Sequence, residues 1–154
     1  MPRFATSARC AAPPGEVFRF IVTLASWTSF TGYGPLPGIV EATLPPGEEM
    51  RLGARVRVRN TDGSVHHEVV TAWEPGSRYG VRMELGPPAS RLMSGIEEEI
   101  QLELDAGGTR VTRRFTTHAR GWWTWPMVWL VTHLLLKPAV RRHDRAAWAA
   151  LKTP

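Results

Sequence analysis

Residues 96–117 read IEEEIQLELDAGGTRVTRRFTT, and this stretch decides the fold class. Apolar and polar residues alternate on both sides of the DAGG segment at 105–108, which is the pattern of two strands that share one apolar face. Glycine in that segment supplies the backbone angles that a tight hairpin turn requires. The stretch therefore predicts a long antiparallel hairpin.

Two charged residues, Glu98 and Arg113, fall on the apolar face of this hairpin. Pairing Leu104 with Thr109 across the turn places Glu98 opposite Phe115 and makes it a diagonal neighbour of Arg113. A charge on an inward face is costly unless it is paired. The two residues either line a cavity and bind the polar end of a ligand or form a structural ion pair, unless a shifted register exposes both.

The residues before the hairpin predict an antiparallel meander with helices near its start. Apolar residues alternate with polar ones in further short segments, and a helical stripe with a second short helical piece follows the first of them. The predicted strands cover 3–11, 39–44, 55–59, 65–73 and 79–85, and the predicted helices cover 14–24 and 26–30. Together with the hairpin, this gives six or seven strands joined by short turns.

The last third of the chain is helical from Gly121 onward. Pro126 suits a first helical turn, whereas Pro138 lies inside the pattern and is expected to kink the helix. The apolar run of about 15 residues is shorter than the ~20 residues that a membrane span needs, which favours a buried core helix. The stripe predicted to face the sheet consists of Trp122, Trp125, Trp129, His133 and Leu136.

Four tryptophans between 122 and 129 are more than one helical stripe can bury. Residues such as Trp123 then lie on another side of the helix. One interpretation is a wide core face, and a second is a homodimer contact, because a large exposed apolar patch usually marks one. A third is contact with a membrane surface, assisted by the nearby Lys137, Arg141 and Arg142.

Composition limits the function classes. The 154 residues favour a single domain spanning 1–154, and an apolar fraction of 43% is typical of globular proteins. The net charge of +5 comes from dispersed basic residues and indicates no nucleic-acid partner. Cys10 is the only cysteine, which favours a reducing compartment, and no apolar signal segment follows Met1. We therefore expect a cytoplasmic protein with no metal site and no cofactor.

Three segments carry a resemblance to a known family. They are PGEVF at 14–18 with Trp27 behind it, EVVTAWEP at 68–75, and GGTRVTRRF at 107–115. With the order of the predicted elements, they make nearly the whole chain resemble the SRPBCC, START-like or Bet v 1-like superfamily, which includes polyketide cyclase/dehydrase and lipid-transport proteins. The resemblance implies an α+β helix-grip fold. In that fold a curved six- to seven-stranded antiparallel sheet wraps around a long C-terminal helix, with two short helices after the first strand.

The resemblance also implies a hydrophobic ligand in a cavity between the sheet and the helix. It offers no shared catalytic motif, so Glu98, Arg113 and His67 are named as catalytic candidates only by their chemistry. We expect a binding or transport protein for a small lipid-like or polyketide-like molecule. The alternatives are a polyketide cyclase or aromatase and an interaction module acting through the Trp-rich helix. The residues predicted to bind the ligand are Phe30, Tyr33, Leu36, His67, Trp73, Tyr79, Met83, Glu98, Arg113, Phe115, Trp122, Trp125, Trp129 and His133.

Overall fold

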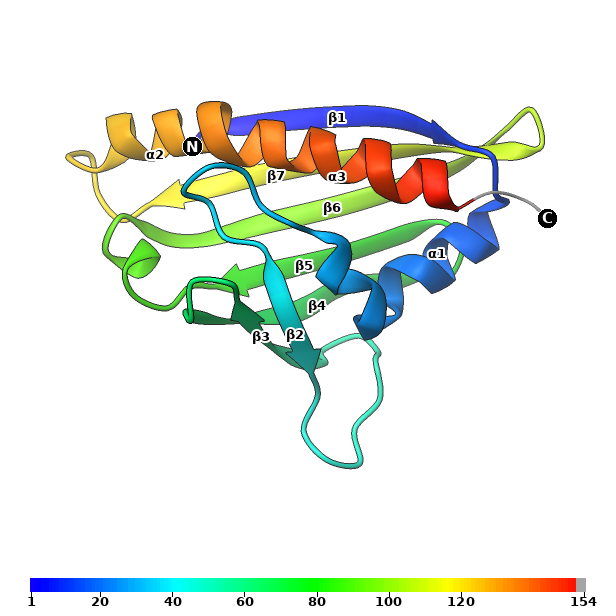
Figure 1. Cartoon of the computed structure of the whole chain (residues 1–154), viewed down its shortest axis with the longest axis horizontal. Coiled ribbons are helices and arrows are strands. Elements are labelled where there is room, and N and C mark those ends of the chain that lie inside the picture. Colours follow the sequence, from blue (N-terminus) through cyan, green and yellow to red (C-terminus); the bar gives the residue numbers. More distant parts are fainter. Residues whose placement is uncertain (152–154) are drawn as a thin grey trace.

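A seven-stranded antiparallel sheet forms the body of the computed structural model, which describes residues 1–151. The strands follow the order β1-β7-β6-β5-β4-β3-β2, so only β1 leaves its place in the meander, to pair with β7 (Figure 1). This confirms the predicted sheet. The strands are β1 (Arg3–Cys10), β2 (Ile39–Thr43), β3 (Arg55–Asn60), β4 (Val65–Glu74), β5 (Arg78–Glu84), β6 (Met93–Asp105) and β7 (Gly108–Ala119).

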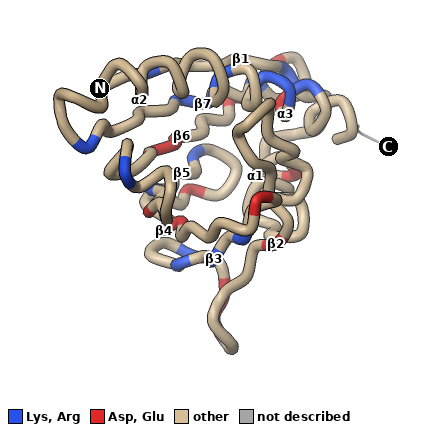
Figure 2. The backbone as a smooth tube through the Cα atoms, turned by 60° about the vertical axis from the view of Figure 1, so that its left-hand side comes forward, with Lys and Arg blue, Asp and Glu red and all other residues tan. Residues whose placement is uncertain are grey.

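The helices lie on one side of the sheet, as the helix-grip expectation requires. Two short helices follow β1, and a long helical stretch after β7 runs along the sheet in three consecutive parts. Figure 2 shows the sheet curling away from this long stretch toward β3. The helical segments are α1 (Pro14–Val22), η1 (Leu24–Ser29), η2 (Ala89–Arg91), α2 (Trp125–Val131), η3 (Thr132–Leu136) and α3 (Lys137–Ala150).

The β6–β7 hairpin has the predicted register. Leu104 pairs with Thr109 and Glu98 pairs with Phe115. The turn between the strands holds two consecutive residues in the left-handed region, with φ of 49° at Ala106 and 82° at Gly107. Two such residues characterise the hairpin turn whose twist matches that of the flanking strands.

Two apolar clusters make up the core. One joins α1 to the sheet and to the end of α3, with Phe18 and Trp148 among its members. The other lies under the long helix, where Phe4 stacks on Phe115 with ring centroids 4.9 Å apart and Val140 packs nearby. The two clusters fix the ends of the long helix and leave a space between the helix and the middle of the sheet.

The inward face of the long helix differs from the predicted one. Trp122 is 85% exposed, Trp125 and Trp129 are 45% and 42% exposed, and His133 is half-buried. Of the predicted stripe, only Leu136 is buried. The side chains that face the sheet instead share a spacing of four residues: Thr124, Val128, Thr132, Leu136 and Val140.

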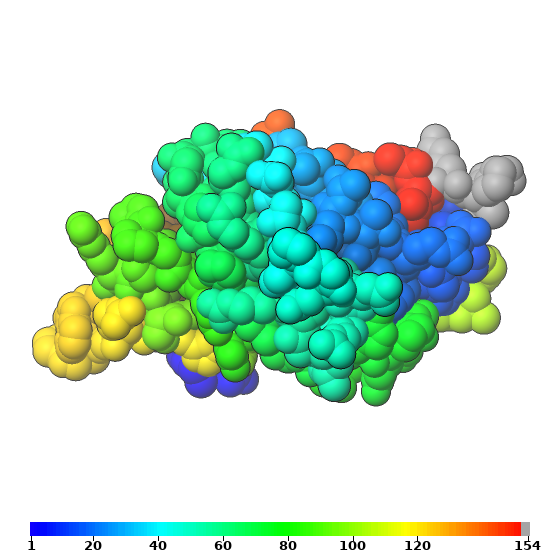
Figure 3. Space-filling view, turned by 90° about the horizontal axis from the view of Figure 1, so that it is seen from below, coloured from blue at the N-terminus to red at the C-terminus, as the bar shows by residue number. Residues whose placement is uncertain are grey.

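Close packing explains this correction. The Thr132 hydroxyl lies 2.7 Å from that of Thr117 on β7, and both side chains are fully buried. A helix this close to a strand has room for Val and Thr beneath it, whereas an indole ring would hold the two elements apart. The tryptophans therefore face away from the sheet, and the segment leading into α2 projects from one end of the molecule (yellow in Figure 3).

Pro138 is accommodated inside the helical stretch. The five residues before α3, Thr132–Leu136, form a π-helical turn, in which the Lys137 amide bonds the Thr132 carbonyl. Pro138 then occupies the first turn of α3, directly after this π-helical turn. The expected disturbance at Pro138 is thus a wider turn directly before it.

Candidate functional site

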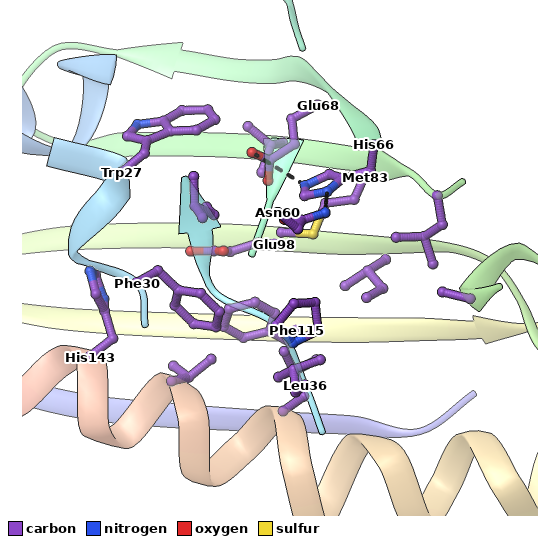
Figure 4. A pocket seen from close by; sticks show the side chains of 18 of the residues that line it. Trp27, Phe30, Leu36, Asn60, His66, Glu68, Met83, Glu98, Phe115 and His143 are labelled. Atoms are coloured by element: carbon purple, nitrogen blue, oxygen red, sulfur yellow. Dashed lines mark hydrogen bonds and ion pairs between the residues drawn. The ribbon is translucent and has the colours of Figure 1, made fainter. Parts of the chain in front are cut away.

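A cavity of about 400 Å³ lies between the long helix and the concave face of the sheet. Most of its lining is apolar and comes from β5, β6 and β7, from the chain around Leu36, and from the helix at Val131 and Leu136. Figure 4 shows Phe30, Leu36 and Phe115 between the helix and the polar groups of the far wall. This volume is within the range of about 300–1,000 Å³ that small-molecule sites occupy.

The mouth of the cavity is marked by lining residues that are also exposed. These are Pro35, Asp62, Pro87 and Pro88. Leu135 on the long helix completes this rim and lies 4.0 Å from the position that a Cβ atom on Gly34 would take. The opening is therefore bounded by two proline-containing loops and the π-helical part of the helix.

An ion-pair network forms one polar wall of the cavity. Arg113 donates through Nε and Nη2 to Glu98 Oε1, at 3.0 and 2.8 Å, and through Nη1 to Asp144 Oδ1 at 2.8 Å. All three side chains are buried. Burial raises the pKa of Glu98, and the Arg113 guanidinium opposes that rise. The predicted Glu98–Arg113 pair is therefore present, with Asp144 as a third member.

Further contacts hold this network in place from α3 and β1. Asp144 accepts hydrogen bonds from the Thr6 hydroxyl at 2.9 Å and from the Trp148 indole at 3.2 Å. His143 Nδ1 accepts from Arg113, so its Nε2 carries the proton and donates to Ser29 at 2.9 Å. Burial, with Arg113 adding to it, lowers the pKa of His143 to about 4, so the ring is neutral near pH 7.

Glu68 on β4 is the second polar feature of the cavity and forms no ion pair with an arginine or lysine of the described residues. Its carboxyl group and that of Glu98 both point into the pocket in Figure 4. Within the described residues, the basic side chain that lies within 4.0 Å of this carboxyl group is His66, whose Nε2 is 4.0 Å from Glu68 Oε2. Burial, and then the charge of Glu98, raise the pKa of Glu68 to about 8. Near pH 7 the side chain is therefore mainly a neutral acid that can donate a hydrogen bond.

The His66 ring is fixed beside Glu68. Asn60 Nδ2 donates to His66 Nδ1 at 3.0 Å, so the ring proton sits on Nε2 and points toward Glu68. Burial, with His67 adding to it, lowers the pKa of His66 to about 4. The imidazole is therefore neutral and does not supply the missing positive charge.

Tyr79 supplies a third polar group. Its ring packs edge-on against Phe18 and Trp73, and the residue is part of the cavity lining. Among residues 1–151, it is the one buried side-chain polar atom without a hydrogen-bond partner. Burial raises the pKa of Tyr79, and Glu68 and Glu98 raise it further, so the hydroxyl stays protonated. An unpaired buried hydroxyl is costly, and a ligand oxygen would satisfy it.

The charge balance favours neutral ligands. The network sets two carboxyl groups, Glu98 and Asp144, against one cation, Arg113, while Glu68 and both histidines are neutral near pH 7. A ligand carboxylate would bring a third carboxyl group into a buried site whose one cation is already shared by two, which is costly. A hydroxyl or carbonyl oxygen meets donors at Glu68 and Tyr79 without that cost.

Half of the fourteen residues predicted to bind a ligand line the cavity. These are Phe30, Leu36, Tyr79, Met83, Glu98, Arg113 and Phe115. The others are placed elsewhere: Trp73 packs on Phe18, and Tyr33 is exposed in its loop. The residues outside the cavity lining are Tyr33, His67, Trp73, Trp122, Trp125, Trp129 and His133.

The residues predicted to bind the ligand do not include Glu68, His66 and His143, which carry the acid and imidazole groups described above. On β4 the prediction selected the odd-numbered residues as the inward face, whereas His66, Glu68 and Val70 point inward. This corrects the expected cavity position of His67. The available signal was the charge at Glu68 within an otherwise apolar run.

No cluster of three or more His, Cys, Asp or Glu side chains within residues 1–151 is arranged to hold a metal ion. Over the same part of the chain, no helix combines the length and the apolar character that crossing a bilayer demands.

Known proteins share this architecture. The sequence profile of the family described as "Polyketide cyclase / dehydrase and lipid transport" matches residues 1–153. No curated protein sequence matches the chain. The fold is similar to a Chromobacterium violaceum protein (TM-score 0.67, 11% identity, 99% and 98% of the two chains covered). It is also similar to Ara h 8.0201 (0.59, 17%, 78% and 78%) and to a protein described as the Aha1 dimer from Colwellia psychrerythraea (0.64, 17%, 99% and 97%).

Proposed function

Because the chain belongs to the polyketide cyclase/dehydrase and lipid-transport family, we propose that it binds and carries a small, mostly apolar molecule in the cavity between the sheet and the long helix. The observation that carries the proposal is a cavity of about 400 Å³ with apolar walls and polar groups gathered on one side. Burying about 200 Å² of apolar ligand surface there contributes about 5 kcal/mol.

The polar wall narrows the ligand class to neutral molecules with a hydroxyl or carbonyl oxygen. Glu68 as a neutral acid and the unpaired Tyr79 hydroxyl both offer a proton to such an oxygen. The carboxylates of the Arg113 network disfavour an anionic head. The apolar wall formed by Phe30 and Phe115 takes the rest of the molecule.

Native mass spectrometry of the freshly purified protein tests binding directly, because a co-purified ligand adds its mass. A second test uses the neutral fluorescent ketone prodan as a probe. Met83→Trp fills the cavity and should abolish the fluorescence gain, whereas Arg82→Trp, one residue along on the exposed face of β5, should keep it. Equal binding by the two variants would show that the probe does not occupy the cavity.

The ligand class is tested by competition and by pH. Decanol should displace prodan at least about tenfold better than decanoate, because only decanoate brings a charge into the buried site. Probe binding should weaken from about pH 7 to pH 9.5, as Glu68 with its pKa of about 8 loses its proton. Glu68→Gln keeps a neutral donor and should remove this pH dependence. A preference for decanoate would refute the proposed ligand class.

A second candidate function is acid catalysis of a cyclisation. It is favoured by one observation, the neutral Glu68 in the cavity with a pKa of about 8, since a general acid works best when its pKa is near the working pH. The test is turnover of a linear poly-β-ketone thioester. Glu68→Gln should bind this substrate and fail to convert it. Conversion at the wild-type rate by this variant would exclude Glu68 as the acid.

Two other expectations from the sequence stay proposals. The buried, unpaired Cys10 is consistent with a cytoplasmic location, where thiols stay reduced. A homodimer through the Trp-rich helix is testable by the molar mass in solution. The relative described as a dimer shares 17% identity and supports the fold alone.

A further inference from the structure

The outward side of the long helix carries a concentrated apolar surface, which we call the Trp face. Seven of the twelve exposed large apolar side chains of residues 1–151 belong to it. Trp122 and Trp123 are 85% and 64% exposed and contact each other edge to face, with ring centroids 6.3 Å apart. The Trp face consists of Trp122, Trp123, Trp125, Met127, Trp129, Leu130 and Leu134.

Folding of the chain does not account for the Trp face. The helix is already anchored by its opposite side, where Val128 and Thr132 are fully buried against the sheet. A helix that is packed on one side and faces water on the other carries polar residues on its outer side. Here the outer side is apolar over about three turns, which is typical of a contact surface.

The charged residues that flank the Trp face in the sequence are all of one sign. Residues 106–143 contain no aspartate and no glutamate, although they contain seven arginines and lysines. Arg120 precedes the Trp face, and Lys137, Arg141 and Arg142 follow it. Figure 2 shows basic positions in blue on the loop entering α2 and along the helix that follows. The surface is thus apolar in its centre and basic at both ends, which complements an anionic layer.

A second copy of the chain fits this surface poorly. In a symmetric dimer the same patch meets itself, so the basic residues of the two copies would approach one another. No acidic residue between 106 and 143 would be available to pair with them. The headgroup region of a bilayer instead offers anionic lipids for Lys and Arg and an amphipathic layer in which Trp is favoured.

We propose that the Trp face binds the surface of anionic lipid bilayers, with the long helix lying along the membrane plane. The same helix contributes Val131 and Leu135 to the cavity lining. Leu134 on the Trp face directly precedes Leu135 at the rim, so membrane contact brings the mouth of the cavity next to the bilayer. A neutral apolar ligand could then pass between bilayer and cavity along the helix.

The test is sedimentation with vesicles of phosphatidylcholine containing about one third phosphatidylglycerol, compared with vesicles of phosphatidylcholine alone. The wild-type protein should bind the anionic vesicles at least about tenfold more tightly, and added salt should weaken the binding. The double variant Trp122→Ser/Trp123→Ser should lose about tenfold or more. Its control is Leu52→Ser/Leu104→Ser, which removes two exposed apolar side chains elsewhere and should bind normally.

Charge is tested separately. Arg141→Glu/Arg142→Glu should lose binding to anionic vesicles, whereas Arg51→Glu/Arg57→Glu, which makes the same change at exposed positions outside the helix, should bind nearly as wild type. Equal binding to neutral and anionic vesicles, or no binding at all, would overturn the proposal. A wild-type dimer that becomes a monomer on Trp122→Ser/Trp123→Ser, without vesicle binding, would assign the Trp face to a second copy instead.

The cavity and the Trp face are independent in this design. Met83→Trp fills the cavity and leaves the helix surface unchanged, so it should still bind anionic vesicles. Trp122→Ser/Trp123→Ser should still bind prodan in solution. Loss of one property without the other therefore distinguishes failure of the membrane proposal from failure of the carrier proposal.

Discussion

Replacing Arg113 with methionine removes the one cation that pairs with two buried carboxyl groups and keeps an unbranched apolar stem. The guanidinium makes four hydrogen bonds of 2.8–3.0 Å, two to Glu98, one to Asp144 and one to His143. Removing one partner of a buried ion pair costs about 3–5 kcal/mol. Because two carboxylates lose their counterion here, we expect Arg113→Met to lower the free energy of unfolding by about 5 kcal/mol and Tm by roughly 10–20 °C.

The loss should depend on pH. Burial already raises the pKa of Glu98, and removing the opposing Arg113 raises it further, so in the variant the folded state binds this proton more tightly than the unfolded state and stability falls as pH rises above about 4. The difference from wild type should therefore be smaller near pH 5 than near pH 8. Urea unfolding followed by circular dichroism at both pH values measures this difference.

Two further variants complete the design. Arg114→Met changes the neighbouring arginine, whose hydrogen bond to Gln101 is exposed, and should cost less than about 1 kcal/mol. Glu98→Gln/Arg113→Met removes one of the two unpaired charges and should be more stable than Arg113→Met alone. A loss below about 1 kcal/mol for Arg113→Met, or a double variant less stable than the single one, would refute the reasoning.

Three other predictions concern single side chains. Burial, and then Glu98, raise the pKa of Glu68 to about 8, so the folded state retains a proton and the free energy of unfolding falls as pH rises from about 4.5 to 8. Glu68→Gln should flatten this fall when urea unfolding is measured over that pH range, and an unchanged dependence of the free energy on pH would contradict the prediction. Thr132→Val removes the buried hydrogen bond to Thr117 and should lower the free energy of unfolding by about 1–2 kcal/mol, measured by thermal unfolding. An unchanged free energy of unfolding would argue against a role of that bond in holding the helix on the sheet. The fully buried Cys10 thiol should react with an aromatic disulfide reagent only as fast as the protein opens, so immediate labelling of the native state would show that this end of β1 is accessible.

The part of the site that could be predicted depends on local patterns. In the β6–β7 hairpin the turn and the alternation fix the register together, so the Glu98–Arg113 contact follows from sequence. Asp144 was not predicted as their partner because it comes from α3, 31 residues after Arg113. Its position depends on how the long helix crosses the sheet, which no local pattern specifies.

Two faces were assigned wrongly for different physical reasons. On β4, Val69 and Val70 are adjacent, so either phase of the strand buries one valine and hydrophobicity does not choose between them. Glu68 points inward because the observed register pairs it with Met83. On the long helix, size misled the prediction, since the largest apolar side chains face outward and Val and Thr fill the narrow contact with the sheet.

The π-helical turn at Thr132–Leu136 has a consequence for helical phase. An α-helix rotates by about 100° per residue, so over the twenty residues from Thr124 to Asp144 an unbroken α-helix would rotate the Asp144 side chain by roughly 200° relative to that of Thr124, to nearly the opposite side. Both are buried on the same side. A π turn takes up one extra residue and so cancels about half of this angular drift. Deleting one residue within Thr132–Leu136 would remove the extra residue of the π turn. The helix would then keep either Asp144 buried or the Trp face outward, but not both, although the deletion removes none of the contacts that either makes.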